Sequence, residues 1–287
     1  MKMKKHMTLG QLSSHLLRAC LVVPFLCPLL WLFVASLWPD YQPLSVLWRN
    51  SFRPTLGNYV SAANLVPMAR FAFNSLRVVI VAVPLTLLVA SWAGFALIRL
   101  PARVQEVIIW LSLAALLAPP TALWLARFPL FKALGWVDTL WPLIAPALIG
   151  GTPFFVLLFY WSFRRLPPEL FEAAILDGAS VWQLWWHIAL PTSSNTVAGV
   201  TILSFVLFWG NFTDPLLYLR SEAQMTLPVG LRLLAQLDAT RHTVIMAGAV
   251  MLTLPVLVVF WVGQRFFWHE WNVALRSNQL DKIQNEI

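Results

Sequence analysis

Residues 78–98 read VVIVAVPLTLLVASWAGFALI, a stretch without a charged side chain that lies between Arg77 and Arg99. A helix of about 20 residues crosses roughly 30 Å of hydrocarbon, and it satisfies its own backbone hydrogen bonds there. The length and the apolar composition of this stretch therefore predict a membrane-spanning helix.

Similar apolar stretches recur along the chain. Together with the first, they are residues 19–38, 78–98, 107–125, 140–163, 196–219 and 244–263. The whole chain shares this character, since 59% of its 287 residues are hydrophobic and 11% are charged, whereas about 25% are charged in a soluble domain. The sequence predicts an all-α polytopic membrane protein with about six transmembrane helices in one domain, residues 1–287.

Prolines interrupt two of the expected spans. Pro119 and Pro120 cut the third span, and the fourth contains Pro142, Pro146 and Pro153. Proline lacks a backbone N–H and clashes with the preceding turn, so we expect kinks that neighbouring helices support.

The positive charges near the first span indicate an orientation. Lys2, Lys4 and Lys5 precede that span, and six crossings return the chain to the side on which it starts. Because Lys and Arg concentrate on the cytoplasmic side, we expect both termini there. The run 19–38 also lacks a clear small-x-small cleavage site, which favours a retained span over a signal peptide.

The sequence lacks the motifs of several other classes of protein. HExxH and CxxC do not occur, and Cys20 and Cys27 are seven residues apart in one span, so we predict no metal and no disulfide. A GxxxxGK[ST] loop that could hold ATP phosphates is missing, and so is the GxSxG motif of a hydrolase. The net charge of +8 comes from scattered residues, which argues against nucleic-acid binding.

The connection 164–195 between the fourth and fifth spans predicts two short helices with a bend. Residues 166–191 read LPPELFEAAILDGASVWQLWWHIALP. Pro167 and Pro168 suit a helix start, and Gly178 suits a left-handed cap that ends this helix. Ser180 and the glutamine three residues later form a capping box for a second helix, which we expect Pro191 to close.

The two short helices differ in their surfaces. Trp182, Trp185 and Trp186 share one face of the second helix, which predicts packing on the membrane or on neighbouring spans. The first helix offers Ala173 and Ala174 beside carboxylates. Such a small acidic surface suits docking into a groove of another protein.

The pattern Glu172-Ala-Ala-x-x-Asp-Gly-Ala-Ser, followed by Ile188-x-Leu-Pro191, resembles the EAA loop of importer permeases that depend on a periplasmic binding protein. The resemblance implies a bacterial inner-membrane subunit whose loop is the coupling helix on a cytoplasmic ATPase. Glu172 would pair there with a basic residue. The residues it implies for coupling are Glu172, Ala173, Ala174, Asp177, Gly178, Ala179, Ile188, Leu190 and Pro191. Without the resemblance, Glu172 would be a dipole-favouring residue at a solvated helix start.

Other segments resemble the carbohydrate branch of these importers, as in the second permease of a maltose-type transporter. They are Asn58-Tyr59, Asn74-Ser75-Leu76, Gly94 to Leu100, Thr226 to Leu231 and Gln264 to Phe267. The tail 268–287 departs from the family pattern, since it lacks the usual glycine-rich ending.

Polar residues near span ends are candidates for the solute path. Trp209, Asn211 and Asp214 lie near the end of the fifth span, and Asn74 precedes the second. Polar groups at membrane depth tend to face a cavity or a partner. The alternative for Asp214 is a position at the outer interface.

The resemblance implies a permease that forms half of a solute path for a sugar or an oligosaccharide. Its partners would be a homologous permease, an ABC ATPase dimer that uses ATP and Mg, and an extracytoplasmic solute-binding protein. We expect no cofactor and no catalytic residue in this chain. The alternatives are a permease for a polyamine or a phosphate ester, a membrane-embedded hydrolase and a passive channel.

Overall fold

The computed structural model describes residues 9–39 and 53–284, with side chains for residues 20–39 and 53–265. The charged N-terminus with Lys2, Lys4 and Lys5 lies outside the described residues, as do the side chains of the divergent tail. The described chain is helical and contains no strand, which confirms the all-α class.

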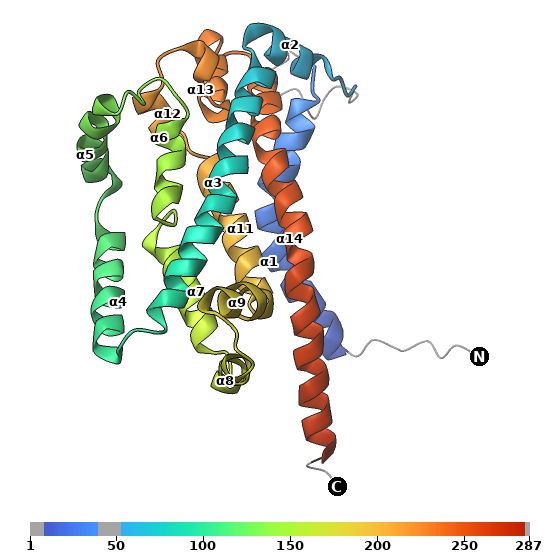
Figure 1. Cartoon of the computed structure of the whole chain (residues 1–287). Coiled ribbons are helices and arrows are strands. Elements are labelled where there is room, and N and C mark those ends of the chain that lie inside the picture. The colour runs from blue at the N-terminus through green and yellow to red at the C-terminus, as the bar shows by residue number, and fades with distance from the viewer. Residues whose placement is uncertain (1–8, 40–52, 285–287) are drawn as a thin grey trace. The chain divides into compact units, whose positions relative to one another are not determined.

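The helices follow one another closely along the chain (Figure 1). The α-helices are α1 Leu9–Ser36, α2 Gly57–Leu65, α3 Met68–Leu97, α4 Ala102–Leu117, α5 Pro120–Ala133, α6 Trp141–Ile144, α7 Pro153–Arg164, α8 Pro168–Leu176, α9 Val181–Gln183, α10 Leu190–Thr192, α11 Ser194–Trp209, α12 Thr213–Tyr218, α13 Leu227–Leu237 and α14 His242–Gln284. Two 3-10 helices, η2 Ala145–Ile149 and η4 Glu222–Gln224, and one π-helix, η3 Leu184–Ala189, complete the set.

Four stretches of the described chain are long and apolar enough to cross a membrane. They are Met68–Leu97, Trp141–Arg164, Ser194–Tyr218 and His242–Arg265. The pair α4 and α5 becomes a fifth candidate if its two helices count as one span, and Cys20–Ser36 is a shorter apolar helix. The polytopic membrane class is therefore confirmed, while the described residues give four or five spans where the sequence predicts about six.

The third expected span is two helices instead of one. α4 ends at Leu117 and α5 begins at Pro120, with a bend of 93° between them. Ala118 and Pro119 are extended, with ψ of 130° and 131°. A residue before proline is disfavoured in the helical region, so the two consecutive prolines stop α4 and start α5.

The fourth expected span breaks at glycines. Gly150 and Gly151 follow η2 with φ of +79° and +77°, a region that favours glycine. Pro153 then occupies the first turn of α7, where its missing N–H leaves no helical hydrogen bond unmade. The prolines predicted to kink this span thus begin helical turns, and the glycines make the break.

The chain divides into two units. One comprises Met1–Met68 and Gly230–Thr253, and the other comprises Ala69–Val229 and Leu254–Ile287. In the first unit, Asn58 Nδ2 donates to the carbonyls of Ser36 and Trp38 at 2.8 and 2.6 Å. These bonds satisfy carbonyl groups at and just beyond the C-terminal end of α1 and fix α2 beside them.

The core of the second unit joins α3, α7, η3 and α11. Its buried residues are Ala90, Phe95, Phe155, Phe159, Phe163, Leu184, Trp185, Ala189 and Val200. α3 and α7 approach closely at Gly94, where an added Cβ would lie 2.7 Å from Phe159 Cβ and 2.9 Å from the Tyr160 backbone nitrogen.

We expect Gly94→Ala to lower the stability of the protein by about 1–3 kcal/mol, because the new methyl group meets backbone atoms that cannot move aside. The thermal unfolding midpoint in detergent measures this loss. Ala96→Leu, a larger change at an exposed position of the same helix, is the control and should leave the midpoint unchanged. Equal midpoints for both variants would contradict close packing of α3 on α7.

Candidate functional site

The segment α8–α10 forms the bent pair of short helices that the sequence predicts. α8 begins at Pro168, and Gly178 has φ of +83°, as its predicted role as a left-handed cap requires. The capping box is present as well. The Ser180 backbone N–H donates to Gln183 Oε1 at 2.7 Å, and the Gln183 N–H donates to Ser180 Oγ at 3.4 Å.

The prediction that Pro191 closes the second helix is wrong. α9 continues as the π-helix η3 and then as α10, with Pro191 in the first turn of α10. Within η3 the turn widens, so that the Leu190 N–H bonds the carbonyl of Trp185, five residues back. An α-helix would need a donor at residue 191 for the His187 carbonyl, and proline has none.

An aromatic cluster holds this segment on α3. Trp185 is completely buried, and its ring centroid lies 4.9 Å from that of Trp92 on α3. Trp182 lies 5.3 Å from Trp92, and Phe171 of α8 lies 6.1 Å from Phe95. The predicted packing of the tryptophan face on a neighbouring span is therefore found, and both short helices have a fixed attachment.

The residues predicted for coupling separate into two groups. Ala174, Ala179, Ile188 and Leu190 pack against the core of the second unit. The exposed members are Glu172, Ala173, Asp177, Gly178 and Pro191. Of the two alanines that were predicted to permit close approach, Ala173 alone remains on the open face of α8.

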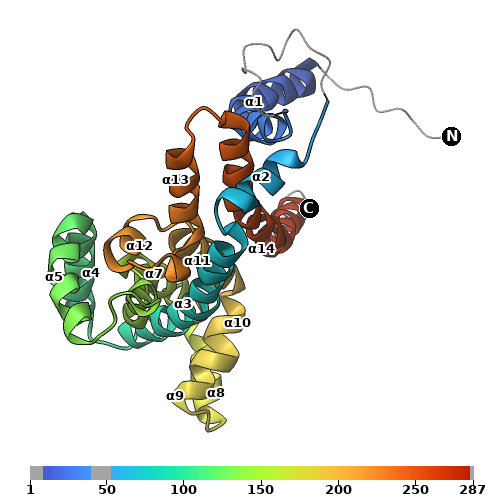
Figure 2. The same cartoon turned by 90° about the horizontal axis from the view of Figure 1, so that it is seen from above.

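The open face of α8 mixes acidic and apolar side chains. Glu169, Glu172 and Asp177 are exposed, and beside them Ile175 is 54% and Leu176 is 88% exposed. The segment lies at one end of the second unit and projects to one side of it (Figures 1 and 2). A rigid helix with an exposed leucine next to carboxylates can bury that leucine in a groove of another protein.

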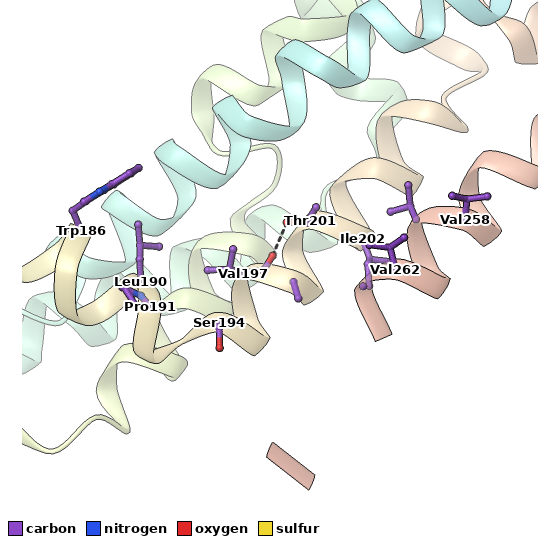
Figure 3. Close-up of a pocket in the computed structure, with 12 residues that line it drawn as sticks. Trp186, Leu190, Pro191, Ser194, Val197, Thr201, Ile202, Val258 and Val262 are labelled. Atoms are coloured by element: carbon purple, nitrogen blue, oxygen red, sulfur yellow. Dashed lines mark hydrogen bonds between the residues drawn. The ribbon is translucent and has the colours of Figure 1, made fainter. Parts of the chain in front are cut away.

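A groove runs along the other flank of the segment (Figure 3). It has a volume of about 740 Å³, and Trp186, Leu190 and Pro191 face Ile202 of α11 and Val258 and Val262 of α14 across it. Its walls are almost entirely apolar, and the hydroxyl group of Thr201 donates to the Val197 carbonyl at 2.7 Å. Pro191, in the first turn of α10, is one of the residues that line this groove.

Of the residues predicted for the solute path, Trp209, Asn211 and Asp214 lie at or beside the break between α11 and α12, and Asn74 lies in the second turn of α3. Asn211 Nδ2 donates to Asp214 Oδ2 at 2.8 Å, and the Asp214 N–H donates to Asn211 Oδ1 at 3.2 Å. This pair closes the break between α11 and α12, and Trp209 is buried at the end of α11. Asn74 Nδ2 donates to the carbonyls of Ala223 and Met225, both at 2.9 Å.

Asp138 makes a polar contact with the loop after α12 that the sequence analysis did not predict. Its Oδ1 accepts hydrogen bonds from the backbone N–H groups of Arg220 and Ser221 and from Ser221 Oγ, all at 2.9 Å. These donors, first the Ser221 N–H, hold the pKa of Asp138 below its ordinary value of 3.8. Asp138 has φ of +63°, a backbone position that Asp tolerates better than most residues, and this turn tendency is the signal in the sequence.

No three His, Cys, Asp or Glu side chains gather as metal ligands among residues 20–39 and 53–265. The arrangement offers instead an exposed acidic and apolar face at one end of the second unit and polar loop contacts at the other.

The chain matches a family of transport proteins over most of its length. The model of the family described as binding-protein-dependent transport system inner membrane component matches residues 7–267. The arabinooligosaccharides transport system permease protein of Halalkalibacterium halodurans is 33% identical over 248 residues, which cover 84% of this chain and 87% of that protein. The lactose transport system permease protein of Rhizobium radiobacter is 30% identical over 195 residues, 68% of this chain and 71% of that protein.

A solved structure has the same fold. It is a bacterial ABC transporter involved in the import of the acidic polysaccharide alginate. The TM-score is 0.67 at 22% identity, and the match covers 92% of this chain and all of the other.

We expect Asp138→Ala to speed hydrogen exchange of the Arg220–Ser221 backbone by about tenfold or more, because charge-assisted hydrogen bonds contribute about 1.5–3 kcal/mol. Since the folded pKa is lowered, the contact is complete above the ordinary pKa and is lost as the pH falls through the lowered value. Exchange mass spectrometry on the peptide that contains both residues measures the effect at neutral pH. Asp238→Ala, which removes a comparable contact to Thr240 in another loop, is the control and should leave that peptide unchanged.

Proposed function

This chain belongs to the family of binding-protein-dependent transport system inner membrane components, and from that membership we propose that it forms half of the solute path of an ABC importer for a sugar or an oligosaccharide. The named solutes of its relatives support the choice of solute, since lactose and arabinooligosaccharides are both sugars. The observation that carries the coupling role is the exposed acidic and apolar face of α8 on a buried aromatic attachment.

We infer that the energy for transport comes from partner subunits. The sequence has no GxxxxGK[ST] loop, so a partner ATPase dimer binds and hydrolyses ATP with Mg, and this chain binds no cofactor. A homologous permease supplies the other half of the path. A solute-binding protein on the outer side delivers the solute, in keeping with the description of the family.

The coupling step in this proposal is the docking of α8 into a cleft of the ATPase. Glu172 faces outward to pair with a basic residue, and Leu176 enters an apolar pocket. Phe171 and Trp185 connect the segment to α3 and α7, so that motion of the ATPase reaches the spans through packed side chains. Alternating access of the solute site to the two sides of the membrane then follows.

The docking role fixes an orientation in the bacterial inner membrane. α8 faces the cytoplasm, where the ATPase is, and the opposite end of the second unit faces outward. With the six crossings that the sequence predicts, both termini are cytoplasmic. The weight of Lys2, Lys4 and Lys5 on the cytoplasmic side supports this orientation.

We expect Leu176→Asp and Glu172→Lys each to lower solute-stimulated ATP hydrolysis of the assembled importer by about tenfold or more. Burying a leucine contributes about 1.5–3 kcal/mol, and a reversed charge repels a basic partner. Both side chains are exposed, so insertion into the membrane and the unfolding midpoint should be unchanged. Glu222→Lys, an exposed change away from α8, is the control; full stimulation in all three variants would contradict docking through α8.

We expect cells with the complete importer to take up lactose or arabinooligosaccharides, and cells without this chain to lose that uptake. Radiolabelled spermidine and glycerol 3-phosphate, tested in parallel, represent the polyamine and phosphate-ester alternatives. Uptake of either of these, with no uptake of a sugar, would replace the proposed solute class and leave the coupling role in place.

A further inference from the structure

A chain of hydrogen bonds crosses from the end of α7 to the turn between α3 and α4. Arg164 Nη1 donates to Tyr160 Oη at 2.7 Å, and Tyr160 Oη donates to Gln105 Oε1 at 2.9 Å. Gln105 Nε2 donates in turn to the carbonyls of Leu100 and Ile98 at 2.8 and 3.3 Å. The bonds all point the same way, from a charged donor to backbone carbonyl groups, and bonds aligned in this way strengthen one another.

Tyr160 is the buried centre of this chain. Its side chain is completely enclosed, whereas Arg164 is exposed at the end of α7. The guanidinium group also lies over the Tyr160 ring, 5.8 Å from its centroid. The loss of a hydrogen-bond partner is costly for a buried hydroxyl group, so these contacts hold the phenol in one position between α7 and α4.

Gln105 ties the end of α3 to the start of α4. The two carbonyl groups that its side chain binds lie just beyond Leu97, the last residue of α3, where carbonyl groups lack partners within the helix. Its own backbone N–H, in the first turn of α4, donates to the Pro101 carbonyl at 3.1 Å. The turn 98–101 is therefore held as one piece, and Tyr160 attaches this piece to α7.

A second side-chain bond leaves the end of α7 toward another helix. Thr196 Oγ1 of α11 donates to Ser162 Oγ at 2.8 Å. Tyr160 and Ser162, two residues apart in α7, thus hold α4 and α11 respectively. A displacement of the end of α7 would reach α3, α4 and α11 through these side chains.

The end of α7 is also the place where α8 joins the second unit. Residues 165–167 alone separate Arg164 from Pro168 (Figure 1). Among the described residues, the side chains of α8 to α10 form hydrogen bonds only within their own segment. Hydrophobic packing is non-directional, whereas a hydrogen bond fixes the distance and the angle between two groups. The bonds at the end of α7 are therefore the directional link between α8 and the helices beyond it.

We propose that Tyr160 and Gln105 are positioning residues that transmit a displacement of α8 to the turn between α3 and α4. The inference rests on the proposed coupling role of α8 and deepens it. α8 moves the end of α7 through the short connection, and the chain from Tyr160 to Gln105 carries this movement to α3 and α4 in fixed register. Without the chain, α8 still docks and the ATPase still hydrolyses ATP, but the spans follow incompletely.

Two tyrosines allow a matched test. Tyr160→Phe removes the proposed link, and Tyr59→Phe removes a comparable bond in the first unit, where Tyr59 Oη and Ser36 Oγ share a hydrogen bond at 2.8 Å. Each variant is assembled with its partner subunits in proteoliposomes. The measured quantity is the number of ATP molecules hydrolysed for each molecule of lactose or arabinooligosaccharide taken up, with whichever of these sugars the parent transports.

We expect Tyr160→Phe to raise this ratio by about fivefold, the effect of one hydrogen bond, and Tyr59→Phe to leave it unchanged. Solute-stimulated ATP hydrolysis should stay at the parent's level in both variants, because docking through α8 is intact. Both should lower the unfolding midpoint by about 2–4 °C, so a merely structural role of Tyr160 would make the two variants alike.

A double variant tests whether Tyr160 and Gln105 act in one chain. Gln105→Leu should raise the ratio as Tyr160→Phe does, and the two changes together should raise it no further, since either one interrupts the same chain. A ratio at the parent's level in Tyr160→Phe, an equal rise in Tyr59→Phe, or independent effects of the two changes in the double variant would each overturn the proposal.

The outcome with the α8 variants separates this proposal from the coupling role on which it rests. Full stimulation in Leu176→Asp and Glu172→Lys would refute docking, and the transmission with it. Lowered stimulation in those variants, together with a ratio at the parent's level in Tyr160→Phe, would refute the transmission alone. If the parent takes up spermidine or glycerol 3-phosphate instead of a sugar, the ratio is measured with that solute and tests the same link.

Discussion

The burial of Trp185 is the contact on which the arrangement of the second unit depends. The indole is completely enclosed where η3 meets α3, α7 and α11, and Phe171 brings α8 against the same cluster. A docking element has to expose apolar surface while keeping a fixed shape. The buried aromatic side fixes the shape of the segment, and Leu176 and the carboxylates of α8 are exposed, as the proposed docking requires.

Breaks in the spanning helices are the second constraint, because a backbone group without a partner is costly in lipid. At the break between α11 and α12, the Asn211 side chain accepts a hydrogen bond from the Asp214 N–H and donates one to the Asp214 carboxylate. Beyond α12, Asp138 accepts two further backbone N–H groups. Polar side chains thus satisfy backbone groups at these interruptions.

The chain itself connects the two ends of the second unit. From Asp138 it passes through α6, η2 and α7 into α8. Gly94 lets α3 pack closely along α7, and Tyr160 of α7 donates to Gln105 of α4 at 2.9 Å. In the proposed coupling, a displacement of α8 would therefore act on several packed helices at once, which suits a rocking motion better than a local hinge.

Local chemistry could be predicted from the sequence. The apolar runs indicated spanning helices, Gly178 indicated a left-handed cap, and Ser180 with Gln183 indicated a capping box. Each of these depends on residues a few positions apart, and the structure contains all three features. The EAA-type pattern likewise pointed to the family through residues within one short loop.

Contacts between distant residues were decided by the tertiary structure alone. Ala173 and Ala174 are adjacent alanines in the sequence, yet Ala174 packs against the core and Ala173 is exposed. The helix continues through Pro191, directly after the wider turns of η3. Asp138 accepts hydrogen bonds from Arg220 and Ser221, which lie 82 and 83 positions away in the sequence. Nothing in a local pattern specifies which groups meet across the fold, since that depends on how whole helices pack.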